Sequence, residues 1–170
     1  MRRTVFVSAA LPLLLLGCDE RKDTSRSARV VVAESPGTAE CAVCSMVVRE
    51  QPAPRAQVVH RDGARRFLCS LGDLVQYLRA PSRHGKVEAV FVEVLDSTQD
   101  PTRVSAEPRP WVRWEAAHFV VGVARSGVMG VPVLAYRDSD DARRIARAHQ
   151  ARVVRYGRLA SAAKRGRRAH

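Results

Sequence analysis

The sequence predicts an α+β protein made of two ββαβ units joined by a linker and preceded by a lipoprotein signal peptide and a flexible tether. Valine-rich stretches alternate with glycine- and proline-containing turns in both halves of the chain. In each half, one stretch whose apolar residues have helical spacing lies between the second and third candidate strands. The order strand, strand, helix, strand is therefore predicted twice.

Residues 1–17 have the composition of a secretory signal peptide. Arg2 and Arg3 form a short basic region, and the apolar stretch 5–16 that follows is too short to span a bilayer. The tetrapeptide Leu-Leu-Gly-Cys that ends at Cys18 resembles a bacterial lipobox, in which cleavage leaves an acylated cysteine at the new N-terminus. Acyl chains on Cys18 would hold the mature protein on a membrane. We therefore expect a lipid-anchored protein of the bacterial cell envelope that faces the periplasm or the exterior.

A polar segment, residues 18–39, separates Cys18 from the first unit. It contains serine, proline and glycine but no aromatic residue, which is typical of a flexible tether. Only residues 30–33, Val-Val-Val-Ala, have the composition of a short strand. The net charge is +12, or +10 without the two arginines of the signal peptide, which suits an anionic lipid surface or an acidic partner. Nucleic acid is disfavoured as a partner, because the arginines are dispersed and the protein is expected to be exported.

The first unit, residues 40–96, is expected to contain a hairpin, a helix and a third strand. Residues 57–60 and 65–69 flank an Asp-Gly dipeptide, which favours a tight hairpin turn. Residues 87–95 form a mostly apolar run typical of a buried strand. The helix between them has a serine cap and an apolar face, made of Ser70 and of Leu71, Leu74, Val75 and Leu78.

The second unit, residues 118–159, repeats this order. Residues 118–123 and 131–136 are candidate strands, and a proline in the second of them indicates an edge position. Asp138 is placed to cap a helix, and residues 152–156 form the last strand. The inner face of the helix is expected to consist of Ala142, Ile145, Ala146 and His149.

Two further segments complete the predicted organisation. Residues 97–117 are rich in proline and are expected to be a linker, in which Trp111 and Trp114 are packing residues. Residues 160–170 are basic and are expected to be a disordered tail.

The motif with the plainest chemistry is Cys41-x-x-Cys44-x-Met46, which places two thiols and a thioether close together. Sulfur ligands of this kind select soft Cu(I) over hard cations. A disulfide, a redox pair and half of a zinc site are the alternatives. The redox alternative is weakened, because prolines shortly after the motif stop the helix that a thioredoxin-like site requires.

The cysteine count adds a third thiol. If Cys18 is acylated, Cys41, Cys44 and Cys69 remain, so at most one disulfide can form within the chain. Cys69 lies between a strand and a helix N-terminus and is either an activated thiol or a buried structural residue. With His60 on the neighbouring strand, the three cysteines could instead form a Cys₃His zinc site.

Enzymatic activity is the least favoured class. The sequence shows no Ser/His/Asp set, no paired carboxylates in a plausible cleft and no phosphate-binding glycine loop. Taken individually, the histidines are expected to be surface or packing residues and not ligands, namely His60, His84, His118 and His149. We therefore expect a binding protein that is not an enzyme.

The lipobox at Cys18, the motif of residues 41–46, the segment 67–74 (Phe-Leu-Cys-Ser-Leu-Gly-Asp-Leu) and the turn 127–130 (Gly-Val-Met-Gly) together resemble the NosL family. These are the copper lipoproteins that assist bacterial nitrous oxide reductase. The resemblance implies two ββαβ units, a topology also found in organomercurial lyase. It further implies a Cu(I) metallochaperone that delivers copper for the copper-sulfide centre of the reductase. The implied partners are nitrous oxide reductase and its membrane transporter complex; a general exported metal-binding protein, or a structural zinc or redox protein, is the alternative.

The resemblance also implies the copper ligands. Cys44 and Met46 are the expected pair, and Met129 is the expected third ligand because the matching turn of the second unit carries it. Cys41 either joins them or supports them. Family members commonly have glycine where this chain has Ser45. Since this replacement is expected to remove access to positive φ, we expect a slightly altered loop with every sulfur donor in place.

Overall fold

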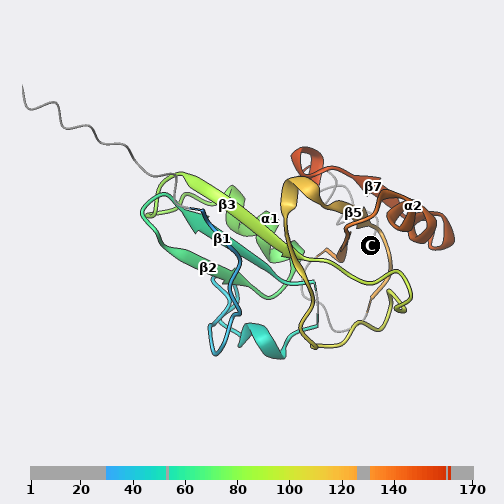
Figure 1. Cartoon of the computed structure of the whole chain (residues 1–170), viewed down its shortest axis with the longest axis horizontal. Helices are drawn as coiled ribbons and strands as arrows, with labels where there is room; N and C mark the ends of the chain where they lie inside the picture. The colour runs from blue at the N-terminus through green and yellow to red at the C-terminus, as the bar shows by residue number, and fades with distance from the viewer. Residues whose placement is uncertain (1–29, 53, 126–130, 160, 162–170) are drawn as a thin grey trace, which may run out of the picture. The chain divides into compact units, whose positions relative to one another are not determined.

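The computed structural model describes residues 30–52, 54–125, 131–159 and 161. The predicted signal peptide, Cys18, most of the predicted tether, the turn with Met129 and nearly all of the predicted basic tail lie outside the described residues. The folded unit begins at Val31, and its helices and strands are drawn in Figure 1. None of the helices in the described part of the chain is both long and apolar enough to cross a membrane.

The first half forms the predicted strand, strand, helix, strand order. Strands β1 (Ala56–His60) and β2 (Arg65–Leu68) make the hairpin, α1 (Leu71–Arg79) follows, and β3 (Val87–Glu93) returns beside β1. The hairpin turn contains Gly63 with φ of +87°, a conformation that glycine adopts without a steric penalty. The strand order is β2-β1-β3-β4, with every neighbouring pair antiparallel.

Strand alternation gives this sheet two apolar faces. Val58 and Val90 point to the main core, where α1 contributes residues such as Leu74, whereas Val59 and Phe91 point to the opposite face. In Figure 1, α1 lies behind β1 and β3. The main core therefore lies on the α1 side of the sheet.

The second half repeats the order in a smaller sheet. Strands β5 (His118–Val121), β6 (Val133–Tyr136) and β7 (Arg152–Val154) pair in the order β6-β5-β7, and α2 (Ser139–Ala148) connects β6 to β7. The Asp138 carboxylate accepts hydrogen bonds from two backbone N–H groups in the first turn of α2, as its predicted cap role requires. The two ββαβ units of the sequence prediction are confirmed.

The two units share one core. Phe119, Val121 and Val133 of the second sheet lie in the same apolar cluster as Val58 and Leu74 of the first unit. The other face of the second sheet packs against α2, through residues that include Val120, Leu134 and Ile145. Burial of the first sheet therefore depends on residues of the second.

The predicted linker contains a strand. β4 (Trp111–Arg113) pairs with β3 and extends the first sheet, with Glu93 opposite Trp111. The free edge of β3 offers backbone groups that need partners, and this short segment provides them. Trp111 and Trp114 are half-buried and pack against apolar clusters, and the Trp114 ring lies 5.0 Å from that of Tyr156. Both tryptophans therefore pack as predicted.

The end of the predicted tether belongs to the folded unit. Residues 31–34, called the strap below, lie on the face of the first sheet opposite α1, where Val31 and Ala33 cover an apolar cluster. The Glu34 N–H donates to Gln57 Oε1 at 3.0 Å, and Gln57 Nε2 donates to the Glu34 carbonyl at 2.9 Å. The Arg65 guanidinium donates to a further strap carbonyl, that of Val32. The expected short strand at 30–33 does not form, because side chains of the sheet take up strap backbone groups that a strand partner would bind.

A buried ion pair holds the irregular segments around β3. Arg55 and Glu93 are 2% and 1% exposed, and two parallel hydrogen bonds of 2.7 Å join the guanidinium to the carboxylate. The remaining guanidinium donors reach the backbone carbonyls of Arg49, Ala106 and Glu107. All five donors of Arg55 are thus used, and the segments near residues 49 and 106 are tied to β3.

Candidate metal centre

A tight loop, residues 41–46, brings two cysteines to one side. The Cys41 N–H donates to the Met46 carbonyl at 2.8 Å, and the Ser45 N–H donates to the Cys41 carbonyl at 2.9 Å. The Ala42 N–H also donates to the Phe67 carbonyl at 2.9 Å, which places the loop against the edge of β2. The loop is therefore positioned by the hairpin, close to the end of β2.

Ser45 corrects one expectation about this loop. We expected the absence of glycine to prevent a positive φ, but Ser45 has φ of +60°. This left-handed region is small but allowed for L-residues, and the two hydrogen bonds across the loop compensate for the unfavourable conformation. The loop keeps the conformation that a glycine would adopt freely.

Replacing Ser45 with glycine is therefore expected to raise the free energy of unfolding by about 1 kcal/mol, because glycine avoids the steric cost of positive φ. Urea unfolding of the metal-free protein measures the change. Ala42→Gly is the matched control, since Ala42 is exposed in the same loop and outside the positive-φ residues of the structure. Ala42→Gly should lower the free energy of unfolding. If Ser45→Gly lowers it as well, the steric cost of positive φ at Ser45 is not the correct explanation.

The third cysteine comes from the junction of β2 and α1. Cys69 directly precedes Ser70, whose hydroxyl caps α1 by accepting from the Asp73 N–H at 3.0 Å. The cap fixes the first helical turn, and the Asp73 carboxylate accepts a hydrogen bond from Cys69 Sγ at 2.9 Å. Cys69 and Asp73 are both buried. The helix start therefore holds a thiol and a carboxylate together.

The loop 41–46 and the junction of β2 and α1 meet in one cluster. One ligand atom each from Cys41, Cys44, Cys69 and Asp73 lies within 4.8 Å of all the others. Cys44 Sγ and Cys69 Sγ are 3.4 Å apart, and Cys41 Sγ lies 3.8 Å from Asp73 Oδ2. Sulfur atoms bound to one metal at about 2.3 Å lie roughly 4 Å apart. The cluster can therefore enclose a single ion after small side-chain rotations.

The cluster also concentrates charge on one sulfur. Hydrogen bonding with the Cys69 thiol lowers the pKa of Cys41 to about 5. The same interaction, together with burial and the nearby Asp73 carboxylate, raises the pKa of Cys69. Burial also raises the pKa of Cys44. At neutral pH the group therefore holds one thiolate, at Cys41, and two thiols.

The predicted site residues divide into three groups. Cys41, Cys44 and Cys69 come together, and Cys44, the only half-buried cysteine of the three, is the most accessible. Met46 is half-buried at the end of the loop and packs against the main core. Met129 lies outside the described residues.

His60 lies away from the cysteines. Its Nδ1 contacts the Gly85 carbonyl at 3.1 Å, and its Nε2 contacts the Tyr77 hydroxyl at 2.9 Å. The hairpin register explains the separation, since Ala56 pairs with Leu68 at the open end while His60 lies four residues further on, at the turn. Four strand residues span about 13 Å, so this structure does not form the Cys₃His set.

Asp73 is the site residue that the sequence reasoning missed. We interpreted it only as an acidic residue in the first helical turn. A signal was present, since Asp73 lies in the first turn of α1 and Cys69 lies directly before Ser70, the cap of that helix. The capping pattern Ser70-x-x-Asp73 also predicts that this carboxylate turns back toward the helix start.

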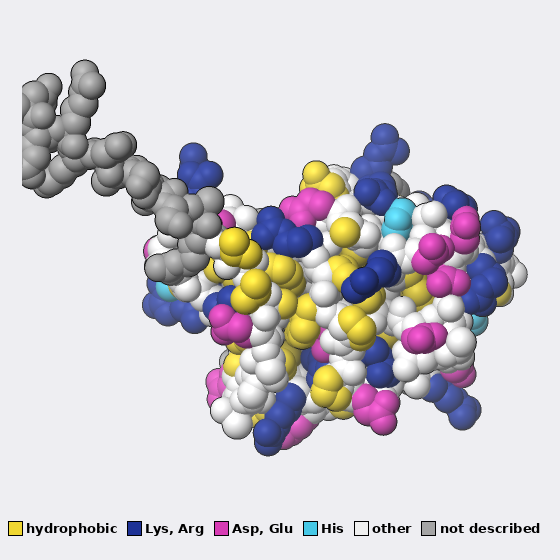
Figure 2. Space-filling view, viewed as in Figure 1, with side chains coloured by type: hydrophobic (Ala, Val, Ile, Leu, Met, Phe, Trp, Pro, Cys, Tyr) yellow, Lys and Arg dark blue, Asp and Glu magenta, His cyan; other side chains and the backbone are white. Residues whose placement is uncertain are grey.

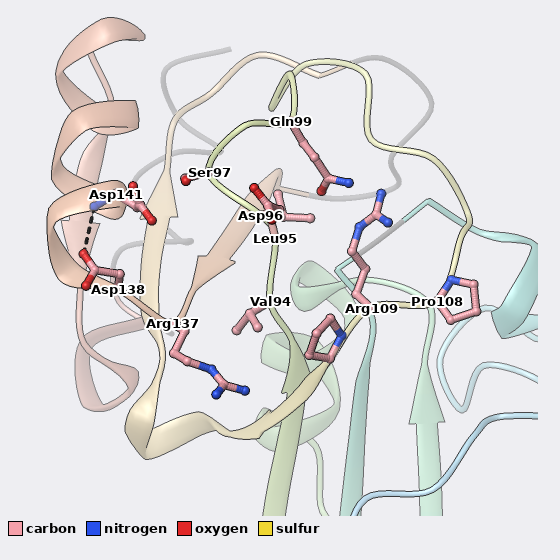
Figure 3. A pocket seen from close by; sticks show the side chains of 11 residues that line it. Val94, Leu95, Asp96, Ser97, Gln99, Pro108, Arg109, Arg137, Asp138 and Asp141 are labelled. Carbon is pink, nitrogen blue, oxygen red and sulfur yellow. Dashed lines mark hydrogen bonds between the residues drawn. The ribbon is translucent and has the colours of Figure 1, made fainter.

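A separate pocket of about 580 Å³ lies between the end of β3 and the start of α2 (Figure 3). Its polar residues include Asp96, Arg109, Arg137 and Asp138. Asp96 accepts hydrogen bonds from Thr98, and Asp138 caps α2. None of the described residues that line this pocket carries sulfur, so the soft-metal chemistry belongs to the cysteine cluster.

Comparison with known proteins identifies the family of this chain. The sequence model of the NosL family matches residues 33–163. The chain belongs to the NosL family. The copper-binding lipoprotein NosL of Stutzerimonas stutzeri is 26% identical over 147 residues, covering 84% of this chain and 72% of the relative. Its counterpart in Achromobacter cycloclastes is 30% identical over 131 residues, covering 76% of this chain and 65% of the relative.

A solved structure supports the fold of this NosL-family chain. The crystal structure of the copper chaperone NosL from Shewanella denitrificans superposes with a TM-score of 0.62 at 23% identity, covering 74% of this chain and 93% of that one. At this identity the match concerns the fold. It agrees with the two ββαβ units described above.

Proposed function

We propose that this protein is a membrane-anchored Cu(I) metallochaperone that delivers copper for assembly of the copper-sulfide centre of nitrous oxide reductase. The observation that carries the proposal is the convergence of three cysteine sulfurs from two distant segments in a NosL-family chain. The proposed partners are the reductase and its membrane transporter complex. Anchoring through Cys18 is supported by the lipobox and by the lipoprotein names of the relatives.

The ligand set suits Cu(I). Three sulfur donors favour a soft ion, and Cys41 already carries the thiolate charge that a monovalent cation requires. Cys41 and Cys69 are buried, while Cys44 is half-buried and is followed by the exposed Ser45. A carrier must give up its ion to a partner, so one accessible sulfur beside two enclosed ones fits the proposed role. Met46 and Met129 are the proposed thioether ligands.

A Cys₃Asp zinc site is the second candidate, favoured by the presence of Asp73 in the cluster. Zinc completes a tetrahedron with a carboxylate, whereas a thioether adds little to zinc binding. The methionines and the aspartate therefore distinguish the two metals.

Replacing Met46 with leucine is expected to weaken Cu(I) binding by about tenfold or more while leaving Zn²⁺ binding unchanged, because leucine preserves the packing volume but removes the sulfur. Anaerobic titration against competing chelators measures both affinities, and Met129→Leu tests the second proposed thioether in the same way. Asp73→Asn is the complementary variant. If it abolishes Zn²⁺ binding while both methionine variants keep full Cu(I) affinity, the zinc site is correct and the copper proposal is wrong.

Metal binding is expected to release about two protons at neutral pH if all three cysteines coordinate, because Cys44 and Cys69 must each lose one while Cys41 is already ionised. The raised pKa values of Cys44 and Cys69 keep both thiols protonated near neutral pH. Because binding then displaces two protons, the metal affinity should fall by about a hundredfold for each unit of decreasing pH. Calorimetry in buffers of different ionisation enthalpy counts the protons. Release of one proton would instead show that Cys69 keeps its hydrogen bond to Asp73.

A further inference from the structure

We propose that one end of the first sheet is a docking surface for an anionic lipid bilayer. This surface, called the basic end, consists of the β1–β2 turn and the α1–β3 loop and carries Arg61, Arg79, Arg83 and Lys86. The inference rests on the lipid anchoring proposed above, and it adds which face of the folded unit meets the membrane.

The cations of the basic end lie together. The Arg61 N–H donates to the Lys86 carbonyl at 3.0 Å, which joins the hairpin turn to the loop after α1. Arg79 ends α1, Arg83 lies in that loop, and all four side chains are exposed. Their positive charge is therefore available to a partner.

Acidic residues only partly offset this charge. Asp62 and Glu88 are the exposed acids of the turn, the loop and the start of β3. The Asp62 carboxylate is engaged, since it accepts from the Ala64 N–H at 2.9 Å and lies 2.9 Å from His84 Nδ1. Four cations against two acids leave a positive surface, which anionic lipid headgroups attract.

The path of the chain brings this end toward the membrane. The strap runs antiparallel to β1, since the Glu34 backbone binds Gln57 near the start of β1 whereas Val31 packs on the cluster that contains Val59 and Ala89, closer to the turn. Its first residues therefore point toward the basic end. The thirteen residues from the acylation site to Val31 span at most about 45 Å when fully extended and about 20 Å as a flexible coil.

Apolar side chains accompany the basic ones. Val32, in the strap, is 59% exposed, and Val87, the first residue of β3, is 38% exposed. Both lie near the basic end. Figure 2 shows hydrophobic and basic side chains close together on the face over β1 and β3. This combination suits the interfacial region of a bilayer, where cations meet headgroups and small apolar groups enter between them.

The arrangement leaves the metal centre free. Cys69 follows the end of β2 opposite Ala56, whereas the basic end adjoins His60 at the other end of β1. α1 runs the same way, from Leu71 beside the cluster to Arg79 at the basic end. The length of β1 and the length of α1 each place the cysteine cluster about 13 Å from the basic end. Docking would therefore direct the cysteines away from the lipid and toward a partner protein.

The test uses the acylated full-length protein in vesicles of phosphatidylcholine alone or mixed with phosphatidylglycerol. Amide hydrogen exchange of residues 61–64 and 80–86 is measured by mass spectrometry. We expect exchange to slow by about tenfold or more only with phosphatidylglycerol, since each basic residue near such a surface strengthens binding about fivefold. High salt should remove the protection.

A charge-reversal variant, Arg61→Glu/Arg83→Glu/Lys86→Glu, should lose this protection. The matched control reverses the same number of exposed basic residues near α2 and β7, namely Arg147, Arg152 and Arg158. Equal exchange rates in both vesicle types, or equal loss of protection in both variants, would overturn the proposal. Lipid attachment is assayed separately by flotation with neutral vesicles, and copper binding by chelator competition, so failure of the proposed function is distinguishable from failure of docking.

Discussion

Replacing Cys44 with serine is expected to lower the Cu(I) affinity more than any other single change, by more than about a hundredfold, because even residues that only support metal ligands contribute ten- to a hundredfold. Cys44 lies 3.4 Å from Cys69 Sγ and is the accessible sulfur of the cluster. Serine keeps the size of the side chain but offers a hard oxygen that Cu(I) binds poorly. The metal-free protein should remain folded, since Cys44 is only half-buried.

Chelator competition under anaerobic conditions measures this loss. Ala42→Ser is the matched control, because it adds a hydroxyl to the same loop without removing sulfur, and its affinity should equal that of the wild type. His60→Asn should also bind Cu(I) normally once its folding is verified, since both imidazole nitrogens contact Tyr77 and Gly85 instead of the cluster. Full Cu(I) affinity in Cys44→Ser would rule out the cysteine cluster as the copper site.

Replacing Arg55 with methionine is expected to lower the free energy of unfolding by about 3–5 kcal/mol, because it leaves the Glu93 carboxylate buried without its partner. Arg55 also binds the carbonyls of Arg49 and Ala106, so its removal frees the segment just after the cysteine loop. Urea unfolding of the metal-free protein gives the change in stability.

The double variant Arg55→Met/Glu93→Met separates the cost of the unpaired buried charge from the loss of the backbone hydrogen bonds of Arg55. It should recover much of the lost stability, since an apolar pair of similar volume needs no counter-charge. Arg143→Met, which breaks an exposed contact with Asp140 on α2, should change the free energy of unfolding very little. A double variant as unstable as Arg55→Met would show that the backbone hydrogen bonds, and not the buried charge, account for the effect.

Local sequence signals predicted the elements well. The Asp-Gly turn, the Ser70 cap and the Asp138 cap act within a few residues, so their structural effects depend little on the rest of the chain. The two ββαβ units follow from these signals together with apolar periodicity. Val31 and Ala33 show the limit of this approach: composition assigned them to a tether, but contacts with a sheet more than twenty residues away hold them in the fold.

The soft ligand types and the close spacing of Cys41 and Cys44 follow from residue order alone, because a six-residue loop leaves few ways to separate them. Which distant groups complete the site depends on the fold. Cys69 and Asp73 join because the backbone of residue 42 pairs with Phe67 at the edge of β2, and His60 is excluded because the hairpin register places it at the far end of β1. Strand register is set by burial and pairing over the whole sheet, so residue spacing along the chain does not reveal it.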